Sequence, residues 1–250
     1  MNTEHLDALK ARLDARRPLP GTVVSNLRED LAVRWTYNSN AIEGNTLTLR
    51  ETKVVLEGIT VGGKSMKEHL EATNHVHAID FIFELVDKGE PLTERTIKEV
   101  HALVLKGIND DIAGKYRTEN VVISGADHVP PDHLHVAEQM AGFMAWYAGD
   151  GMSLHVVERA ARLHVDLVKI HPFSDGNGRT ARLLMNLELM QGGFPPIVVQ
   201  NAERLAYYEA LDTAHTTDNY APFFDLTETI VEKSFEPYWF ALGMDKEQAE

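Results

Sequence analysis

The sequence has no cysteine, no long apolar run and fewer basic than acidic side chains. Its 250 residues include 38 Asp and Glu but only 24 Lys and Arg, which gives a formal net charge of −14. The absence of cysteine excludes disulfides, thiolate nucleophiles and cysteine-ligated zinc or iron–sulfur centres. No stretch is long and apolar enough for a membrane span, and the negative charge disfavours nucleic acid and anionic lipid as partners. We therefore expect a cytoplasmic protein with no nucleic-acid and no membrane partner.

The composition that remains is typical of a globular protein, with 44% hydrophobic and 25% charged residues. Apolar residues recur at helical spacing along most of the chain, and glycine or proline separates the segments. Ser25 and Ser153 are the predicted N-caps of two of these helices. The sequence thus predicts a mainly α fold, with helices that include residues 25–42, 49–56, 66–86, 136–146, 153–168, 179–190, 203–214 and 222–240.

One short segment favours a strand instead. Val121, Val122 and Ile123 form a β-branched run that Ser124 and Gly125 follow. Such a run before a turn is typical of one arm of a hairpin. Because no further strands are predicted, a parallel sheet has no place to form.

The stretch from His171 to Arg182 reads HPFSDGNGRTAR and joins two predicted helices. Gly176 and Gly178 leave the first amide groups of the second helix uncovered, and a helix N-terminus of this kind suits an anion. Arg179 lies three residues before Arg182, so the two guanidinium groups share one face of the helix. Together these features indicate a site for a polyphosphate.

Two further side chains of this stretch can carry chemistry. Asp175 directly precedes the glycines. A carboxylate in a phosphate pocket needs a bridging cation, which is usually Mg²⁺. His171 has an ordinary pKa near neutrality and could act as a general base beside the phosphates. Phe173 is interpreted as an anchor that packs the loop on the core.

The whole stretch resembles the Fic family signature, H-P-F-x-[DE]-G-N-G-R-x-x-R, at every specified position. The resemblance implies a Fic-fold helical bundle with a short β-hairpin flap. It also implies a protein adenylyltransferase, or AMPylase, which transfers AMP from ATP to a Ser, Thr or Tyr hydroxyl of a target protein. Mg²⁺ or Mn²⁺ would be the cofactor, and the enzyme itself could be a target through auto-AMPylation.

The resemblance assigns a role to most residues of the signature. His171 would deprotonate the target hydroxyl, and Asp175 would ligate the metal. The residues that would hold the phosphates of ATP are Gly176, Asn177, Gly178, Arg179 and Arg182, the last of them at the γ-phosphate.

Residues 39–45 read SNAIEGN and resemble the inhibitory motif of the same family, [ST]-x-x-x-E-[GN]. Ser39 and Glu43 occupy its specified positions, and the motif lies N-terminal to the signature. The Glu43 carboxylate could pair with Arg182, occupy the place of the γ-phosphate and misplace ATP. The resemblance also implies that this glutamate can orient a water molecule for the reverse reaction, deAMPylation. A serine on a helix face with a glutamate before a glycine cap is the plainer interpretation.

The resemblance extends over about residues 30–240 and is to the catalytic core of animal members of the family. It implies that Val121, Val122 and Ile123 form a flap that holds the target peptide by strand addition. Tyr207 and Tyr208 match positions near the adenine. His215 stands where relatives often have an asparagine that contacts adenine, which leaves the base selectivity open. Many relatives form homodimers, so we expect that a homodimer is possible here.

These observations predict one compact domain with four parts. They are an N-terminal helical extension (1–24), an inhibitory helix region (25–60), a Fic catalytic core (61–240) and a C-terminal tail (241–250).

Two alternatives stay open. Gly58–Ser65 reads GITVGGKS and satisfies the P-loop pattern, in which Lys64 would bind phosphates and Ser65 would bind Mg²⁺. A P-loop needs a parallel sheet, however, and the sequence predicts none. A Fic enzyme could also transfer another nucleotide or a phosphoryl group. The 12 histidines show no convincing zinc spacing.

Overall fold

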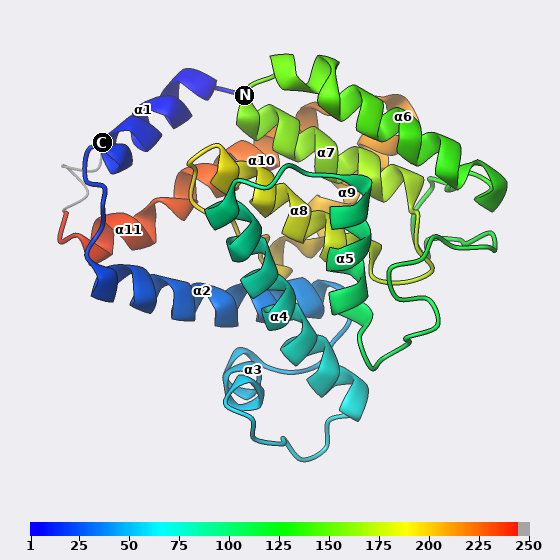
Figure 1. Cartoon of the computed structure of the whole chain (residues 1–250), viewed down its shortest axis with the longest axis horizontal. Coiled ribbons are helices and arrows are strands. Elements are labelled where there is room, and N and C mark those ends of the chain that lie inside the picture. The colour runs from blue at the N-terminus through cyan, green and yellow to red at the C-terminus, as the bar shows by residue number, and fades with distance from the viewer. Residues whose placement is uncertain (245–250) are drawn as a thin grey trace.

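A computed structural model describes residues 1–244, which fold into a bundle of helices (Figure 1). The α-helices are α1 (Thr3–Asp14), α2 (Gly21–Ile42), α3 (Leu49–Leu56), α4 (Met66–Lys88), α5 (Glu94–Leu105), α6 (Val136–Ala148), α7 (Val156–Ile170), α8 (Asn177–Gln191), α9 (Arg204–Thr217), α10 (Ala221–Ser234) and α11 (Glu236–Ala241). The short 3₁₀ turns are η1 (His133–His135), η2 (Asp150–Ser153) and η3 (Asn201–Glu203). The predicted mainly α class is confirmed. Residues 245–250 of the predicted tail lie outside the described part of the chain.

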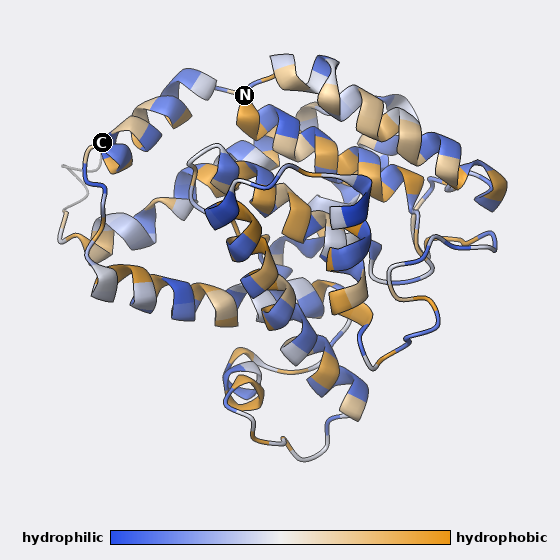
Figure 2. Ribbon diagram, viewed as in Figure 1, coloured by the Kyte–Doolittle hydropathy of each residue, from blue (hydrophilic) through white to orange (hydrophobic). Residues whose placement is uncertain are grey.

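Helix α8 lies at the centre of the bundle, and α2, α4, α5 and α7 pack against it (Figure 1). Every residue from Arg179 to Leu189 is buried. A helix that is buried all round must find partners for its polar side chains inside the protein. In Figure 2, many residues of α7 and α8 are orange, the colour of hydrophobic residues. The charged start of α8 is therefore a polar site built into an apolar core.

Helix α2 brings the predicted inhibitory motif to this centre. Residues 38–42, at its C-terminal end, are all buried. Glu43 caps the helix, and Gly44 follows with a φ of 95° that favours glycine. The chain thus turns sharply just after Glu43 and leaves that side chain at the helix end.

Several predicted helix boundaries are wrong by about one turn. Helix α2 begins at Gly21 rather than at Ser25, because the Pro20 carbonyl already accepts the N–H of Val24 at 3.1 Å. Helix α7 begins at Val156, where His155 provides the cap, and the predicted cap Ser153 lies in η2.

Two more boundaries differ. Helix α8 begins at Asn177 rather than at Arg179, directly after Gly176 in the left-handed conformation. The single helix predicted for residues 222–240 is two helices that break at Phe235. Pro237 follows the break and has no N–H with which to continue the helical hydrogen bonds.

The predicted strand at Val121, Val122 and Ile123 is also wrong, because no strand occurs within residues 1–244. The segment lies in the long loop between α5 and α6 (Figure 1). β-Branched residues favour a strand only where a partner strand supplies hydrogen bonds and packing, and none is present here. The side chain of Val122 is instead 82% exposed.

No helix among the described residues has both the length and the apolarity required to cross a membrane. The predicted division of the chain into four parts stays a prediction.

Candidate functional site

The loop of residues 171–176 joins the two central helices and begins with His171. His171 has a φ of 51°, in the left-handed region, and its N–H donates to the Leu167 carbonyl at 3.0 Å. Few residues other than glycine adopt this conformation, which marks a place where the surroundings fix the backbone. The turn reverses the chain and sends it from the end of α7 to the start of α8.

The imidazole of His171 is held neutral with one nitrogen free. Burial lowers its pKa to about 4, although the Val168 carbonyl and the Glu43 carboxylate oppose this shift. Its Nδ1 lies 3.3 Å from the Val168 carbonyl oxygen. Because a carbonyl can only accept, this hydrogen bond assigns the proton to Nδ1. Nε2 then carries the lone pair that a general base requires.

Asn177 ties the loop together. Its Nδ2 donates to the Phe173 carbonyl at 2.8 Å, and its Oδ1 accepts the Phe173 N–H at 2.9 Å. The predicted contact of Asn177 with phosphate is therefore not available to this amide side chain while the loop keeps this form. The first backbone N–H groups of α8 have no partner within the helix and remain suited to an anion.

Asp175 is the predicted metal ligand. Its carboxylate accepts the N–H of Gly176 at 2.6 Å and is paired with the Arg179 guanidinium at 3.1 Å. Its side chain is 46% exposed, so one carboxylate of the loop faces outwards. Among residues 1–244 no group of three or more acidic or histidine side chains could enclose a metal ion. One carboxylate fits Mg²⁺, which is usually held by one or two carboxylates together with substrate phosphates.

The two arginines of the signature are both buried but have different partners. Arg179 forms ion pairs with Asp175 and with Glu71 of α4, the latter at 3.3 Å. Arg182 binds the segment that was predicted to be inhibitory. Its guanidinium donates to Ser39 Oγ at 3.0 Å, to the Ser39 carbonyl at 2.8 Å and to Glu43 at 2.8 Å.

The charge of Arg182 is secured by its surroundings. Burial acts to lower its pKa, but Tyr207 and Glu43 outweigh that effect and raise the pKa. The Tyr207 hydroxyl accepts from the guanidinium at 3.2 Å. Arg182 is therefore a fixed cation whose donors already have partners.

Glu43 also lies directly over the start of α8. A Cβ atom added at Gly178 would collide with the Glu43 carboxylate. Glycine at this position leaves room for the end of the Glu43 side chain beside Arg182. The structure thus brings together Ser39, Glu43, Gly178 and Arg182, which the sequence places in two distant motifs.

The residues predicted to lie near adenine divide into buried and accessible ones. Tyr207 is buried, and its hydroxyl lies 3.0 Å from Nε2 of His164. Tyr208 is 37% exposed, and its hydroxyl donates to the Ile42 carbonyl at 2.9 Å. His215 is buried, with Nε2 placed 3.0 Å from the Val165 carbonyl. Tyr208 therefore has the more accessible ring of the two tyrosines.

Sequence reasoning missed Arg117, a buried residue outside the signature that forms hydrogen bonds with the loop of residues 171–176. Its Nε donates to the His171 carbonyl at 2.8 Å, and its other nitrogens donate to the carbonyls of Glu119 and Pro131. Its backbone N–H donates to the Pro172 carbonyl at 2.9 Å. A single arginine in a loop gives no local signal of such a role.

The P-loop alternative is wrong. Helix α3, not a strand, precedes Gly58–Ser65. Lys64 donates to the side chain and carbonyl of Thr46, and Ser65 caps α4 together with Glu68. The segment is a turn between α3 and α4, and the side chains of Lys64 and Ser65 bind neighbouring protein groups.

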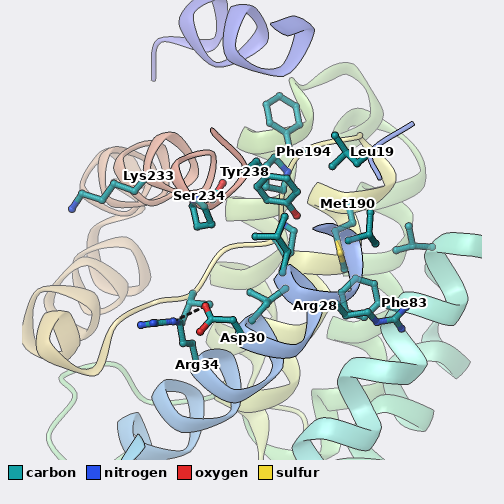
Figure 3. Close-up of a pocket in the computed structure, with 18 of the residues that line it drawn as sticks. Leu19, Arg28, Asp30, Arg34, Phe83, Met190, Phe194, Lys233, Ser234 and Tyr238 are labelled. Atoms are coloured by element: carbon teal, nitrogen blue, oxygen red, sulfur yellow. Dashed lines mark hydrogen bonds and ion pairs between the residues drawn. The ribbon is translucent and has the colours of Figure 1, made fainter. Parts of the chain in front are cut away.

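A cavity of about 860 Å³ lies apart from these residues (Figure 3). Apolar side chains such as Phe83, Met190 and Tyr238 line it, and Arg34 pairs with Asp30 near its edge at 2.7 Å. None of the predicted site residues lines this cavity.

Comparisons with known proteins find the same family in sequence and in structure. Residues 91–189 match the model of the Fic/DOC family. The chain is 38% identical to the protein adenylyltransferase Fic of Nematostella vectensis and 36% identical to that of Culex quinquefasciatus, over 95% of its own length in each case. It covers 56% and 49% of those two proteins, so it spans about half the length of the curated relatives that it matches.

Two solved structures share the fold over almost the whole chain. A Fic-domain protein from Bacteroides thetaiotaomicron superposes with a TM-score of 0.85 at 30% identity, covering 96% of this chain and 97% of that one. Fic-1 from C. elegans gives a TM-score of 0.86 at 31% identity, covering 96% of this chain and 71% of that one. The signature loop, the fold around it and these similarities together show that the chain belongs to the Fic/DOC family.

Proposed function

We propose that this chain is a protein adenylyltransferase that transfers AMP from ATP to a hydroxyl group of a target protein. The observation that carries the proposal is the neutral His171, whose proton on Nδ1 leaves Nε2 as a base, in the loop that leads to the start of α8, where no side chain caps the helix. The names of the relatives support it.

The proposed reaction breaks the bond between the α- and β-phosphates. Nε2 of His171 takes the proton of a Ser, Thr or Tyr hydroxyl, and the hydroxyl oxygen attacks the α-phosphorus. Pyrophosphate leaves with the electron pair of the broken bond. Bound phosphates add negative charge beside the imidazole, which raises the pKa of His171 from its low value towards that of an effective base.

The start of α8 would bind the triphosphate. Its amides and Arg179 face the α- and β-phosphates in this proposal, and Arg182 takes the γ-phosphate. Asp175 would hold Mg²⁺ or Mn²⁺, which neutralises phosphate charge when bound.

We further propose that Glu43 restrains this reaction within the same chain. Its carboxylate occupies Arg182 and lies against Gly178. A γ-phosphate must displace it to reach Arg182, so ATP binds weakly or in a misplaced form. The same carboxylate is suited to orient a water molecule for deAMPylation.

The loop segment of Val121, Val122 and Ile123, in which Val122 is exposed, is the proposed docking element for the target. In this proposal the segment pairs with an extended peptide of the target, which is a general mode of recognition. Arg117 connects the base of this loop to the His171 carbonyl. A homodimer, the cytoplasmic location and the selectivity for adenine stay predictions.

Intact-mass spectrometry tests the proposed function. Glu43→Gly protein incubated with MgATP should gain the mass of AMP through auto-AMPylation, and wild-type protein should gain much less. Glu29→Gln, which removes an exposed carboxylate of the same helix, is the matched control and should behave as wild type. Equal modification of wild type and Glu43→Gly would refute the restraint, and absence of modification in both would refute the transferase.

A further inference from the structure

His101 of α5 reaches the signature loop from outside the signature. It is fully buried, and its two ring nitrogens bond two different backbone segments. Nε2 lies 2.8 Å from the Asp175 carbonyl oxygen, and Nδ1 accepts the Gly114 N–H at 2.9 Å. Because Nδ1 accepts, the proton must be on Nε2, which donates to Asp175. The two bonds are compatible with one neutral tautomer only.

The ring of His101 also packs on the loop. It stacks on Phe173 with the ring centroids 3.6 Å apart and an angle of 4° between the planes. Tyr116 contacts the same phenylalanine, with centroids 5.6 Å apart. A Cβ atom at Gly176 would come within 3.4 Å of the imidazole. His101 thus touches the loop on both sides of Asp175.

These contacts fix the residue that was predicted to hold the metal. The Asp175 carbonyl is held by His101, and its carboxylate is held by Gly176 and Arg179. Rotation of the Asp175 backbone would redirect the carboxylate, because both belong to one residue.

We propose that His101 is a positioning residue for AMP transfer, which sets the backbone of Asp175 and hence the geometry of the metal-binding carboxylate. This inference rests on the proposed function of the loop. His101 does not touch the nucleotide or move a proton. It acts on the metal through Asp175, as residues that orient metal ligands commonly do.

Two substitutions separate the hydrogen bonds from the stacking. His101→Gln keeps one donor and one acceptor but loses the aromatic ring. His101→Phe keeps a ring that can stack on Phe173 but loses both hydrogen bonds. Val100→Ala, which removes buried volume from the same helix, is the control for lost packing. All variants are made in the Glu43→Gly background so that Arg182 is available.

The first readout is binding of the α,β-methylene analogue of ATP, measured by calorimetry with Mg²⁺ and again with a chelator. For His101→Phe we expect the Mg²⁺ concentration at half-saturation to rise about tenfold, the lower end of the usual effect of such residues. With the chelator present, His101→Phe should bind the analogue with the same affinity as the Glu43→Gly background. His101→Gln should restore most of the Mg²⁺ affinity, and Val100→Ala should not alter it. A purely structural role would instead shift His101→Phe and Val100→Ala alike, with and without metal, and this result would overturn the inference.

The second readout needs no substitution of His101. The imidazole N–H of His101 should give an NMR signal that shifts when Mg²⁺ is added to the complex with the analogue. A signal that is unaffected by Mg²⁺ would overturn the inference even if His101→Phe does not fold. Absence of AMP transfer by Glu43→Gly, with Mg²⁺-dependent binding intact and sensitive to His101→Phe, would instead refute the proposed function and support the role of His101.

Discussion

The contact between Glu43 and Arg182 sets how strongly the chain should bind ATP. Replacing Glu43 by Gln keeps the size of the side chain but removes its charge. The carboxylate accepts a bond of 2.8 Å from the guanidinium, and the Glu43 side chain is 33% exposed. A hydrogen bond between charged groups contributes about 1.5–3 kcal/mol, and the partial exposure favours the lower end of this range.

This free energy is what a γ-phosphate must overcome to reach Arg182. Because about 1.4 kcal/mol corresponds to a factor of ten, Glu43→Gln should strengthen ATP binding about tenfold. Glu43→Gly should strengthen it further, because it also removes the bulk of the side chain that lies over Gly178.

The assay is titration calorimetry with the α,β-methylene analogue of ATP and saturating Mg²⁺. Adding Arg182→Ala should abolish this increase in affinity, because the guanidinium that substitution of Glu43 frees for the γ-phosphate is then absent. Glu29→Gln, on the exposed part of the same helix, should bind as wild type does. An affinity for the analogue that is the same in wild type, Glu43→Gln and Glu43→Gly would refute the reasoning.

Arg117, Lys64 and the buried histidines can each be tested by substitution or by pH. Arg117→Lys should lower the free energy of unfolding by roughly 3 kcal/mol. Three carbonyl acceptors lose a guanidinium donor, and the single ammonium group of lysine cannot reach all three. A melting temperature equal to that of wild type would contradict this. Lys64→Ala should leave AMP transfer by Glu43→Gly within a factor of two or so, because Lys64 bonds Thr46 and not phosphate; a complete loss of transfer would contradict this. The free energy of unfolding should fall as the pH drops from about 6.5 towards 4. Burial lowers the pKa of His101, His171 and His215 to about 4, so in this range their rings bind protons in the unfolded chain but not in the folded one. At pH 5.5 the three together should cost roughly 4 kcal/mol relative to pH 7.5, and denaturant midpoints that do not change over this interval would contradict it.

The sequence predicted the helices well where apolar periodicity was strong. Helix α3 was predicted with the bounds that it has, Leu49–Leu56. The boundaries failed where no side chain marked them. Helix α2 begins after Pro20, which has no capping side chain, and Ser25 offered a stronger but unused signal. The β-branched residues Val121, Val122 and Ile123 show the opposite error, because local propensity cannot reveal that a partner strand is missing.

For the site, the signature located the loop and its chemistry but not its supports. The local hydrogen bonds of Asn177 to Phe173 could in principle follow from spacing, yet only the folded backbone shows that the amide is engaged. His101 and Arg117 act over 74 and 54 residues of separation from the loop. Such contacts depend on how α5 packs against α8, which periodicity alone does not determine.

The proposed reaction is AMP transfer with His171 as the general base. It is tested most directly by incubating Glu43→Gly and Glu43→Gly/His171→Ala with ATP labelled with ³²P at either the α- or the γ-phosphate. We expect protein-bound label from the α-labelled ATP only, and its loss in the His171→Ala protein although ATP still binds. Protein-bound label from the γ-labelled ATP would contradict AMP transfer. Equal label from the α-labelled ATP in Glu43→Gly and Glu43→Gly/His171→Ala would contradict the role of His171.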